Sequence, residues 1–91
     1  MKAILIHRFK QACRQGRIEG VIWKVSEPVT PATHGYKYRL VYVVDGERIV
    51  GYDNERGKGD RRHIGGREKP YRFVDVPSLI SDFMKDVEKA E

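Results

Sequence analysis

A two-residue turn at Asp45-Gly46 constrains the fold more than any other feature of this 91-residue sequence. Before it, residues 36–44 alternate, with Tyr36, Tyr38, Leu40, Tyr42 and Val44 on one face, which is the pattern of a half-buried strand. Asp-Gly is favoured in tight hairpin turns, because both central positions need a positive φ. We therefore predict that residues 36–44 pair with residues 47–52 in an antiparallel hairpin. The turn predicts a register in which Tyr42 faces Ile49 and Arg39 faces Tyr52.

The other segments complete an α+β domain. Apolar runs at residues 3–9 and 18–25 predict two further strands, and the proline-containing residues 26–35 predict a loop. Residues 53–70 are charged and lack an apolar period, so we expect a long glycine- and arginine-rich loop. A short edge strand over 71–74 and a helix over about 75–90 follow.

Asp75 is the expected N-cap of that helix, and Pro77 lies in its first turn, where its missing N–H costs no hydrogen bond. Apolar residues then recur at helical spacing. The predicted fold is a single domain, residues 1–91. It has an antiparallel sheet of four to five strands, with the C-terminal helix packed across one face.

The charge balance points to a polyanionic partner. The sequence has 18 Lys and Arg against 13 Asp and Glu, a formal net charge of +5. A basic surface attracts nucleic acid and speeds the encounter with it, although general solubility is an alternative explanation of the charge. Cys13 has no cysteine partner for an internal disulfide, and no apolar run is long enough to span a membrane. We expect a cytoplasmic protein with RNA as its partner, and a homodimer remains open.

The run from Tyr52 to His63 carries groups suited to phosphate chemistry. A metal-free ribonuclease removes a proton from a 2′-hydroxyl, protonates the leaving 5′-oxygen and stabilises charge at phosphorus. Histidine suits the proton steps and arginine the phosphate oxygens, although a lone histidine among solvated charges can also be without function. The candidate catalytic residues are His63, Asp60, Glu55 and Arg61.

A wider set of residues is expected to hold the nucleic acid. Gly57 and Gly59 would let backbone N–H groups approach an anion, and one face of the predicted hairpin would extend the cationic surface. Tyr52 would be available on that face for base stacking. The candidate binding residues are Arg56, Lys58, Arg62, Lys37, Arg39, Arg48, Tyr52 and His34. His7, within the first strand, is interpreted as structural.

A metal-dependent nuclease is a weaker alternative. Asp53, Glu55 and Lys58 loosely resemble the acidic–acidic–lysine sets of such enzymes. In those sites, however, glutamate and lysine lie two residues apart on one face of a strand. Here the interval is three residues and Gly57 interrupts it. We expect no metal ion and no other cofactor.

Four stretches of the sequence resemble the TumE family of small toxins from prokaryotic type II toxin–antitoxin modules. They are Val21-Ile22-Trp23, His34-Gly35-Tyr36-Lys37-Tyr38-Arg39-Leu40, the run from Tyr52 to His63, and Pro70-Tyr71-Arg72-Phe73. The family's central run usually ends in Asp-His-Arg-His, whereas this chain has Arg61 in place of the first histidine. The resemblance implies a growth-inhibiting toxin and a cognate antitoxin that carries a DNA-binding domain.

Three functions remain open from the sequence. The first is an RNA-directed toxin, either an endoribonuclease or an RNA-binding protein, that acts through residues 53–63. The second is a non-catalytic module that binds nucleic acid or another protein. The third is the metal-dependent nuclease that uses Asp53, Glu55 and Lys58.

Overall fold

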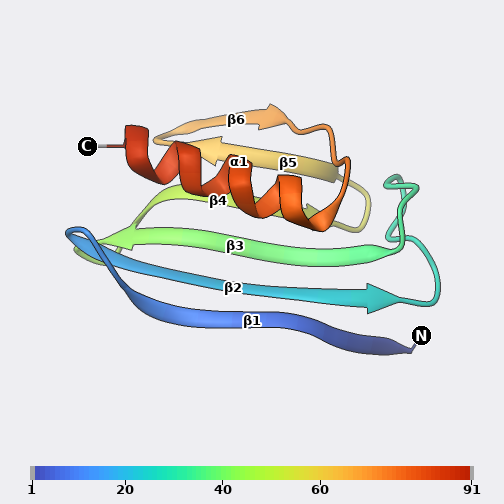
Figure 1. The fold of residues 1–91 in the computed structure, drawn as a ribbon. Helices are drawn as coiled ribbons and strands as arrows, with labels where there is room; N and C mark the ends of the chain where they lie inside the picture. The colour runs from blue at the N-terminus through green and yellow to red at the C-terminus, as the bar shows by residue number, and fades with distance from the viewer. Residues whose placement is uncertain (1, 91) are drawn as a thin grey trace.

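Six antiparallel strands form one sheet, and a single helix lies against one side of it in the computed structural model, which describes residues 2–90 (Figure 1). The elements are β1 (Ala3–Cys13), β2 (Gly16–Val25), β3 (Tyr36–Val44), β4 (Glu47–Glu55), β5 (Gly59–Ile64), β6 (Arg67–Pro70) and α1 (Val76–Lys89). Each strand pairs with its neighbours in the chain, so β1 and β6 are the two edges. The α+β class is as predicted, and the sheet has more strands than the expected four to five. Residues 1 and 91 of the expected single domain lie outside the described residues.

The prediction of a long loop over residues 53–70 is wrong. Strand β4 continues to Glu55, and β5 and β6 occupy most of the remainder. Gly57 and Gly65 have φ angles of 85° and 61°, which only glycine adopts readily, and they make the two hairpin turns possible. The edge strand expected over 71–74 does not form. Those residues connect β6 to α1, and β6 takes the edge position instead.

A β-bulge in the β3–β4 hairpin changes the predicted register. Val43 faces Arg48 as expected, but Tyr42 then faces Val50, and Leu40 faces Tyr52. Ile49 is left as the extra residue on β4, which shifts every later pair by one position. Because alternate side chains of a strand point to opposite faces, this shift moves Tyr52 to the same face as Leu40.

The core lies between the sheet and α1 (Figure 1). On the helix, Leu79, Phe83 and Val87 are buried, as the apolar spacing predicts. Asp75 caps the helix, since its side chain accepts the Ser78 N–H at 2.8 Å. The buried residues that the sheet contributes to this core are Ile18, Ile22, Tyr38, Leu40, Tyr42, Val50 and Tyr52.

One buried polar contact joins the helix to the sheet. The Tyr52 hydroxyl donates a hydrogen bond to Asp86 Oδ2, and both residues are buried. Arg62 Nη1 lies 3.7 Å from the same carboxylate oxygen, so the Asp86 charge is balanced. Burial, together with the hydrogen bond to Asp86, raises the pKa of the Tyr52 phenol well above its usual range. The contact therefore depends on a protonated phenol.

Tyr52→Phe should lower the free energy of unfolding at neutral pH by about 1–3 kcal/mol, because Asp86 loses its buried donor. The raised pKa of Tyr52 contributes stability that is fully present below pH 10, the usual tyrosine value, and is lost as the pH rises above it. The variant should therefore show a smaller loss of stability above pH 10 than the wild type. Urea unfolding at pH 7 and at a series of pH values above 10 tests this, and equal slopes in the two proteins would contradict it.

Candidate functional site

The face of the sheet opposite α1 carries most of the charged side chains of the strands. Cross-strand partners share a face, so the register assigns residues to it directly. No helix covers this side, which we call the open face (Figure 1). Its basic residues are Arg8, Lys10, Arg17, Lys37, Arg39, Arg48 and Arg61. The candidates Lys37, Arg39 and Arg48 thus lie on one surface with His63.

His63, on β5, lies near two carboxylates on the open face. Asp53 is on β4 and Glu68 is on β6. Its Nε2 atom is 3.7 Å from Asp53 Oδ2 and 3.6 Å from Glu68 Oε1. Arg61 Nη2 contacts Glu68 Oε2 at 2.9 Å. We call Asp53, Arg61, His63 and Glu68 the His63 cluster. It combines an imidazole, two acceptors of protons and a guanidinium within one small area.

Two features of the cluster are unusual for a purely structural arrangement. Burial raises the pKa of the Asp53 carboxyl, although the charge of a protonated His63 opposes this. Arg61 Nε is buried, and among the described residues it has no hydrogen-bond partner. Buried polar atoms nearly always have a partner, so the unpaired Arg61 Nε makes this cluster a candidate for a functional site.

Asp60 does not belong with His63. The two residues are three apart on β5, and alternation places Asp60 on the helix face with Tyr38. Asp60 Oδ1 accepts hydrogen bonds from the Tyr38 hydroxyl at 2.6 Å and from His34 Nε2 at 2.8 Å. The sequence analysis grouped Asp60 with His63, but the structure places the two residues on opposite faces of the sheet.

His34 has a structural environment. The Tyr36 N–H donates to His34 Nδ1 at 3.2 Å, so Nε2 carries the ring proton that Asp60 accepts. The imidazole also stacks on Phe73, with ring centroids 3.9 Å apart. Both ring nitrogens are occupied, so His34 has no free position for a ligand or a proton transfer.

The remaining candidates are dispersed around the β4–β5 hairpin. Glu55 and Lys58 form an exposed pair at 3.6 Å beside the turn, where Arg56 is also exposed. The Gly57 N–H donates to Thr30 O at 2.7 Å, so it is already used in holding the 26–35 loop and is not free for an anion. Arg62 lies on the helix face near Tyr52 and Asp86.

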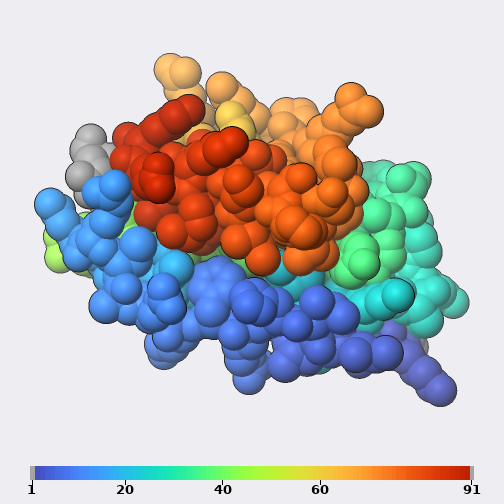
Figure 2. Space-filling view, in the orientation of Figure 1, coloured from blue at the N-terminus to red at the C-terminus, as the bar shows by residue number. Residues whose placement is uncertain are grey.

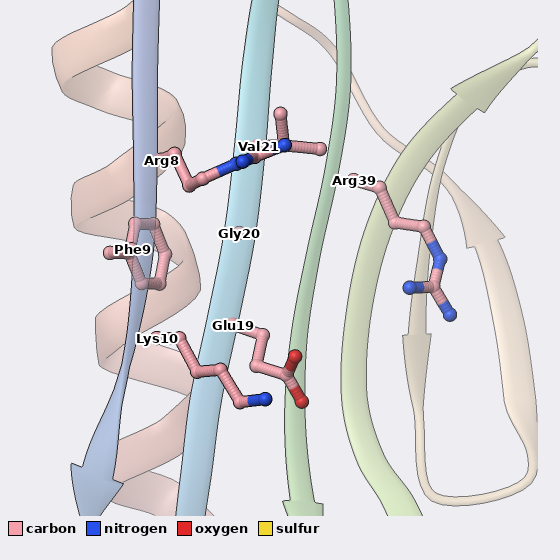
Figure 3. Close-up of a pocket in the computed structure, with 7 residues that line it drawn as sticks. All are labelled: Arg8, Phe9, Lys10, Glu19, Gly20, Val21 and Arg39. Atoms are coloured by element: carbon pink, nitrogen blue, oxygen red, sulfur yellow. The ribbon is translucent and has the colours of Figure 1, made fainter.

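A groove of about 360 Å³ crosses the open face over β1, β2 and β3 (Figure 3). Figure 3 shows Arg8 and Lys10 on β1, Glu19 and Val21 on β2, and Arg39 on β3. Val21 contributes an apolar side chain, and the charged lining consists of three cations and the Glu19 carboxylate. We call this the basic groove. The basic groove lies on the same face of the sheet as the His63 cluster.

Comparison with known proteins identifies the chain's relatives. The model of the toxin TumE family matches residues 5–91. The chain belongs to the TumE family. The membership implies a toxin and an antitoxin partner. A search of curated proteins and a search of solved structures found no match.

Besides Asp60, sequence reasoning also misplaced Tyr52 of this TumE-family chain, and it missed other residues. Tyr52 is fully buried, so it is not available for base stacking. Glu68 of the His63 cluster was missed because residues 53–70 lack the apolar period that would have indicated strands. The Gly65-Gly66 pair was the available signal, since such a pair between polar runs favours a tight hairpin. Arg8 and Lys10 gave no signal without the register of β1.

Two further properties concern metal binding and membranes. Within residues 2–90, no three His, Cys, Asp or Glu side chains lie close enough together to hold a metal ion. Of the residues in the metal-dependent alternative, Lys58 and Glu55 form an ion pair beside the β4–β5 turn. The one helix among these residues is too short and too polar to cross a membrane.

His34 and His63 of this TumE-family chain should respond differently to substitution. His34→Ala should lower the free energy of unfolding by about 1–3 kcal/mol, because it removes a partner from Asp60 and from the Tyr36 N–H. His63→Ala should cost less, since His63 makes no contact shorter than 3.6 Å to its carboxylate partners. Thermal and urea unfolding of both variants measure this. A greater loss in His63→Ala than in His34→Ala would reverse the assignment.

Proposed function

We propose that the chain is a toxin that binds single-stranded RNA on its open face and cleaves it at the His63 cluster. The observation that carries the proposal is the position of the His63 imidazole between Asp53 and Glu68, with Arg61 on the far side of Glu68. The family membership supports the toxin role. The choice of RNA rests on the chemistry of the cluster and on the charge of the face around it.

The cluster has the parts of a metal-free phosphodiester cleavage. The Glu68 carboxylate takes the proton of the 2′-hydroxyl while the 2′-oxygen attacks phosphorus. The bond from phosphorus to the 5′-oxygen breaks, and the protonated His63 imidazole donates its proton to that oxygen. Arg61 stabilises the negative charge on the non-bridging oxygens. The products are a 2′,3′-cyclic phosphate and a 5′-hydroxyl.

Glu68 is a better candidate for the base than Asp53. The Glu68 side chain is 41% exposed, so a 2′-hydroxyl can reach it, whereas the Asp53 side chain is 16% exposed. Asp53, whose Oδ2 lies 3.7 Å from the same Nε2 atom, would help to hold the protonated imidazole in place. Glu55 and Asp60 have no such role in this mechanism, because they lie in the turn and on the helix face respectively.

The basic groove would bind the RNA strand away from the scissile phosphate. Arg8, Lys10 and Arg39 offer charge to phosphates, and guanidinium planes stack on unpaired bases. Arg48 lies between this groove and the His63 cluster, since it is on the β4 strand that separates them and packs over Gly51. A strand of RNA that crosses the sheet would meet the cations of the groove, then Arg48, and then Arg61 of the His63 cluster.

Non-catalytic RNA binding is the second candidate function. The distances of 3.6 and 3.7 Å from His63 Nε2 to the carboxylates are longer than hydrogen bonds, so the proton-transfer geometry has to tighten when a substrate binds. A binding protein needs no such change.

The antitoxin partner would, by the resemblance, carry a DNA-binding domain, and a neighbouring reading frame with a helix-turn-helix would support that.

His63→Ala and Glu68→Gln should each reduce the rate of RNA cleavage by about 100-fold or more, because each removes one proton-transfer group. Lys85→Ala, on the exposed side of α1, is the matched control and should cleave like the wild type. Labelled single-stranded RNA, with and without EDTA, gives the rates and the ends of the products. Wild-type cleavage by His63→Ala excludes this mechanism. Loss of all activity in EDTA would favour the metal-dependent alternative.

RNA binding can be separated from cleavage in the His63→Ala background. Adding Arg8→Ala and Arg39→Ala should weaken binding to a single-stranded oligonucleotide. It should also reduce the slope of log affinity against log salt by about 0.7 for each phosphate that the variant no longer neutralises. Lys85→Ala with Lys89→Ala removes the same charge from the helix and should change neither quantity. Fluorescence anisotropy across a salt series measures both. Absence of RNA binding by the parent protein would contradict the proposal.

A further inference from the structure

The two edges of the sheet differ sharply in how they are protected. Edge strands expose unpaired N–H and C=O groups, and proteins usually blunt them with charge, proline or shortness. Strand β6 has all three, since it is the short run Arg67–Pro70 with alternating charges and a terminal proline. Strand β1 is long, and of its residues only Phe9 and Cys13 are even partly buried. The β6 edge is therefore protected against strand pairing, whereas the β1 edge is not.

The open edge carries an exposed aliphatic patch. Ile4, Leu5 and Ile6 are 65%, 43% and 46% exposed. Ile4 and Leu5 point to opposite faces of the strand, and a β-bulge between Leu5 and His7 takes Ile6 out of register, so exposed aliphatic side chains lie on both faces of this edge. Figure 2 shows β1, in blue, along the margin of the molecule with no other segment beyond it. Adjacent exposed aliphatic residues on an edge strand mark an interaction site.

Strand β1 itself carries only positive charge, although Glu19 on β2 pairs with Lys10. The first acidic residue of the sequence is Glu19, so β1 has none, whereas Arg8 and Lys10 lie on it. These two cations form one wall of the basic groove, immediately beside the edge. An occupant that pairs with β1 therefore needs aliphatic side chains opposite Ile4–Ile6 and acidic side chains opposite Arg8 and Lys10.

We propose that an extended, acidic segment of the antitoxin adds to the β1 edge as a further antiparallel or parallel strand of the sheet. Main-chain hydrogen bonds along β1 supply affinity, while the aliphatic patch and the two cations select the segment. The family membership supplies the partner, and the edge supplies the place and the chemistry.

A second copy of this chain fits the edge less well. Two β1 strands side by side would bring together segments that carry Arg8 and Lys10 and no acidic residue. Like charges on paired strands are destabilising, so self-association lacks the complementarity that an acidic strand provides.

The inferred site also suggests how the antitoxin would neutralise the toxin. This point alone rests on the proposed function. A strand paired with β1 would bring its acidic side chains to Arg8 and Lys10, the wall of the groove assigned to RNA. Antitoxin and RNA would then compete for the same cations. The His63 cluster would remain uncovered, because it lies across the sheet on β4 to β6.

The test uses the full chain and the antitoxin encoded in the same module. Ile4→Thr with Ile6→Thr removes the aliphatic surface while it keeps β-branched residues in the strand. Arg8→Glu with Lys10→Glu reverses the charge. Each pair should weaken antitoxin binding by at least about tenfold, and the second effect should shrink at high salt. Arg67→Glu with Lys69→Glu makes the same reversal on the β6 edge and should leave binding unchanged.

Hydrogen exchange on the wild-type chain provides a test that needs no variant. Amides of β1 should gain protection in the complex, while those of β6 should not. Unchanged exchange in β1, or full binding by the Ile4→Thr/Ile6→Thr protein, overturns the proposal. Protection of β1 that rises with the concentration of the free chain overturns it too, because a second copy would then be the occupant. Binding is measured without RNA, so failure here is separate from failure of the proposed ribonuclease.

Discussion

The register of the β3–β4 hairpin decides which residues of this protein face the core and which face outward. The bulge at Ile49 shifts the pairing by one residue, so that Tyr52 enters the core and Asp53 turns to the open face. Strand β5 takes its register from β4, which places His63 opposite Gly51 and Arg61 opposite Asp53. Strand β6 then brings Glu68 opposite His63. The His63 cluster and the Tyr52–Asp86 contact are both consequences of one inserted residue.

The fold gives His34 and His63 different environments. His34 has both ring nitrogens in hydrogen bonds and stacks on an aromatic ring, which is how a protein uses imidazole as a rigid connector. His63 lies near two carboxylates without a short contact to either. The difference follows from the sheet, because His34 lies on the face that packs against other elements, whereas His63 lies on the face that no helix covers.

Sequence patterns were sufficient where one face of an element is apolar. The alternation in 36–44 and the spacing of Leu79, Phe83 and Val87 on the helix both predict the observed elements. They were insufficient for β5 and β6, because Asp60, Arg62 and Lys69 are polar on the side where a strand normally shows its apolar residues. Those positions are stabilised by partners on other elements, such as Tyr38 for Asp60 and Asp86 for Arg62. The bulge at Ile49 had no residue signature, so Tyr52 and its buried partner Asp86 were beyond prediction. The candidate residues included His63 and Arg61, but only the observed register shows that both lie beside Glu68.

The hairpin turn at Arg56–Lys58 makes the spacing between Tyr52 and His63 as important as the residue types within it. A sheet has only two sides, so a slip of β5 by a single position exchanges them. Such a slip would bring His63 under the helix and turn Asp60 and Arg62 outward. Substitutions in this stretch change one side chain at a time, whereas an insertion or deletion of one residue would invert the whole strand. The distance along the chain is therefore itself part of the motif.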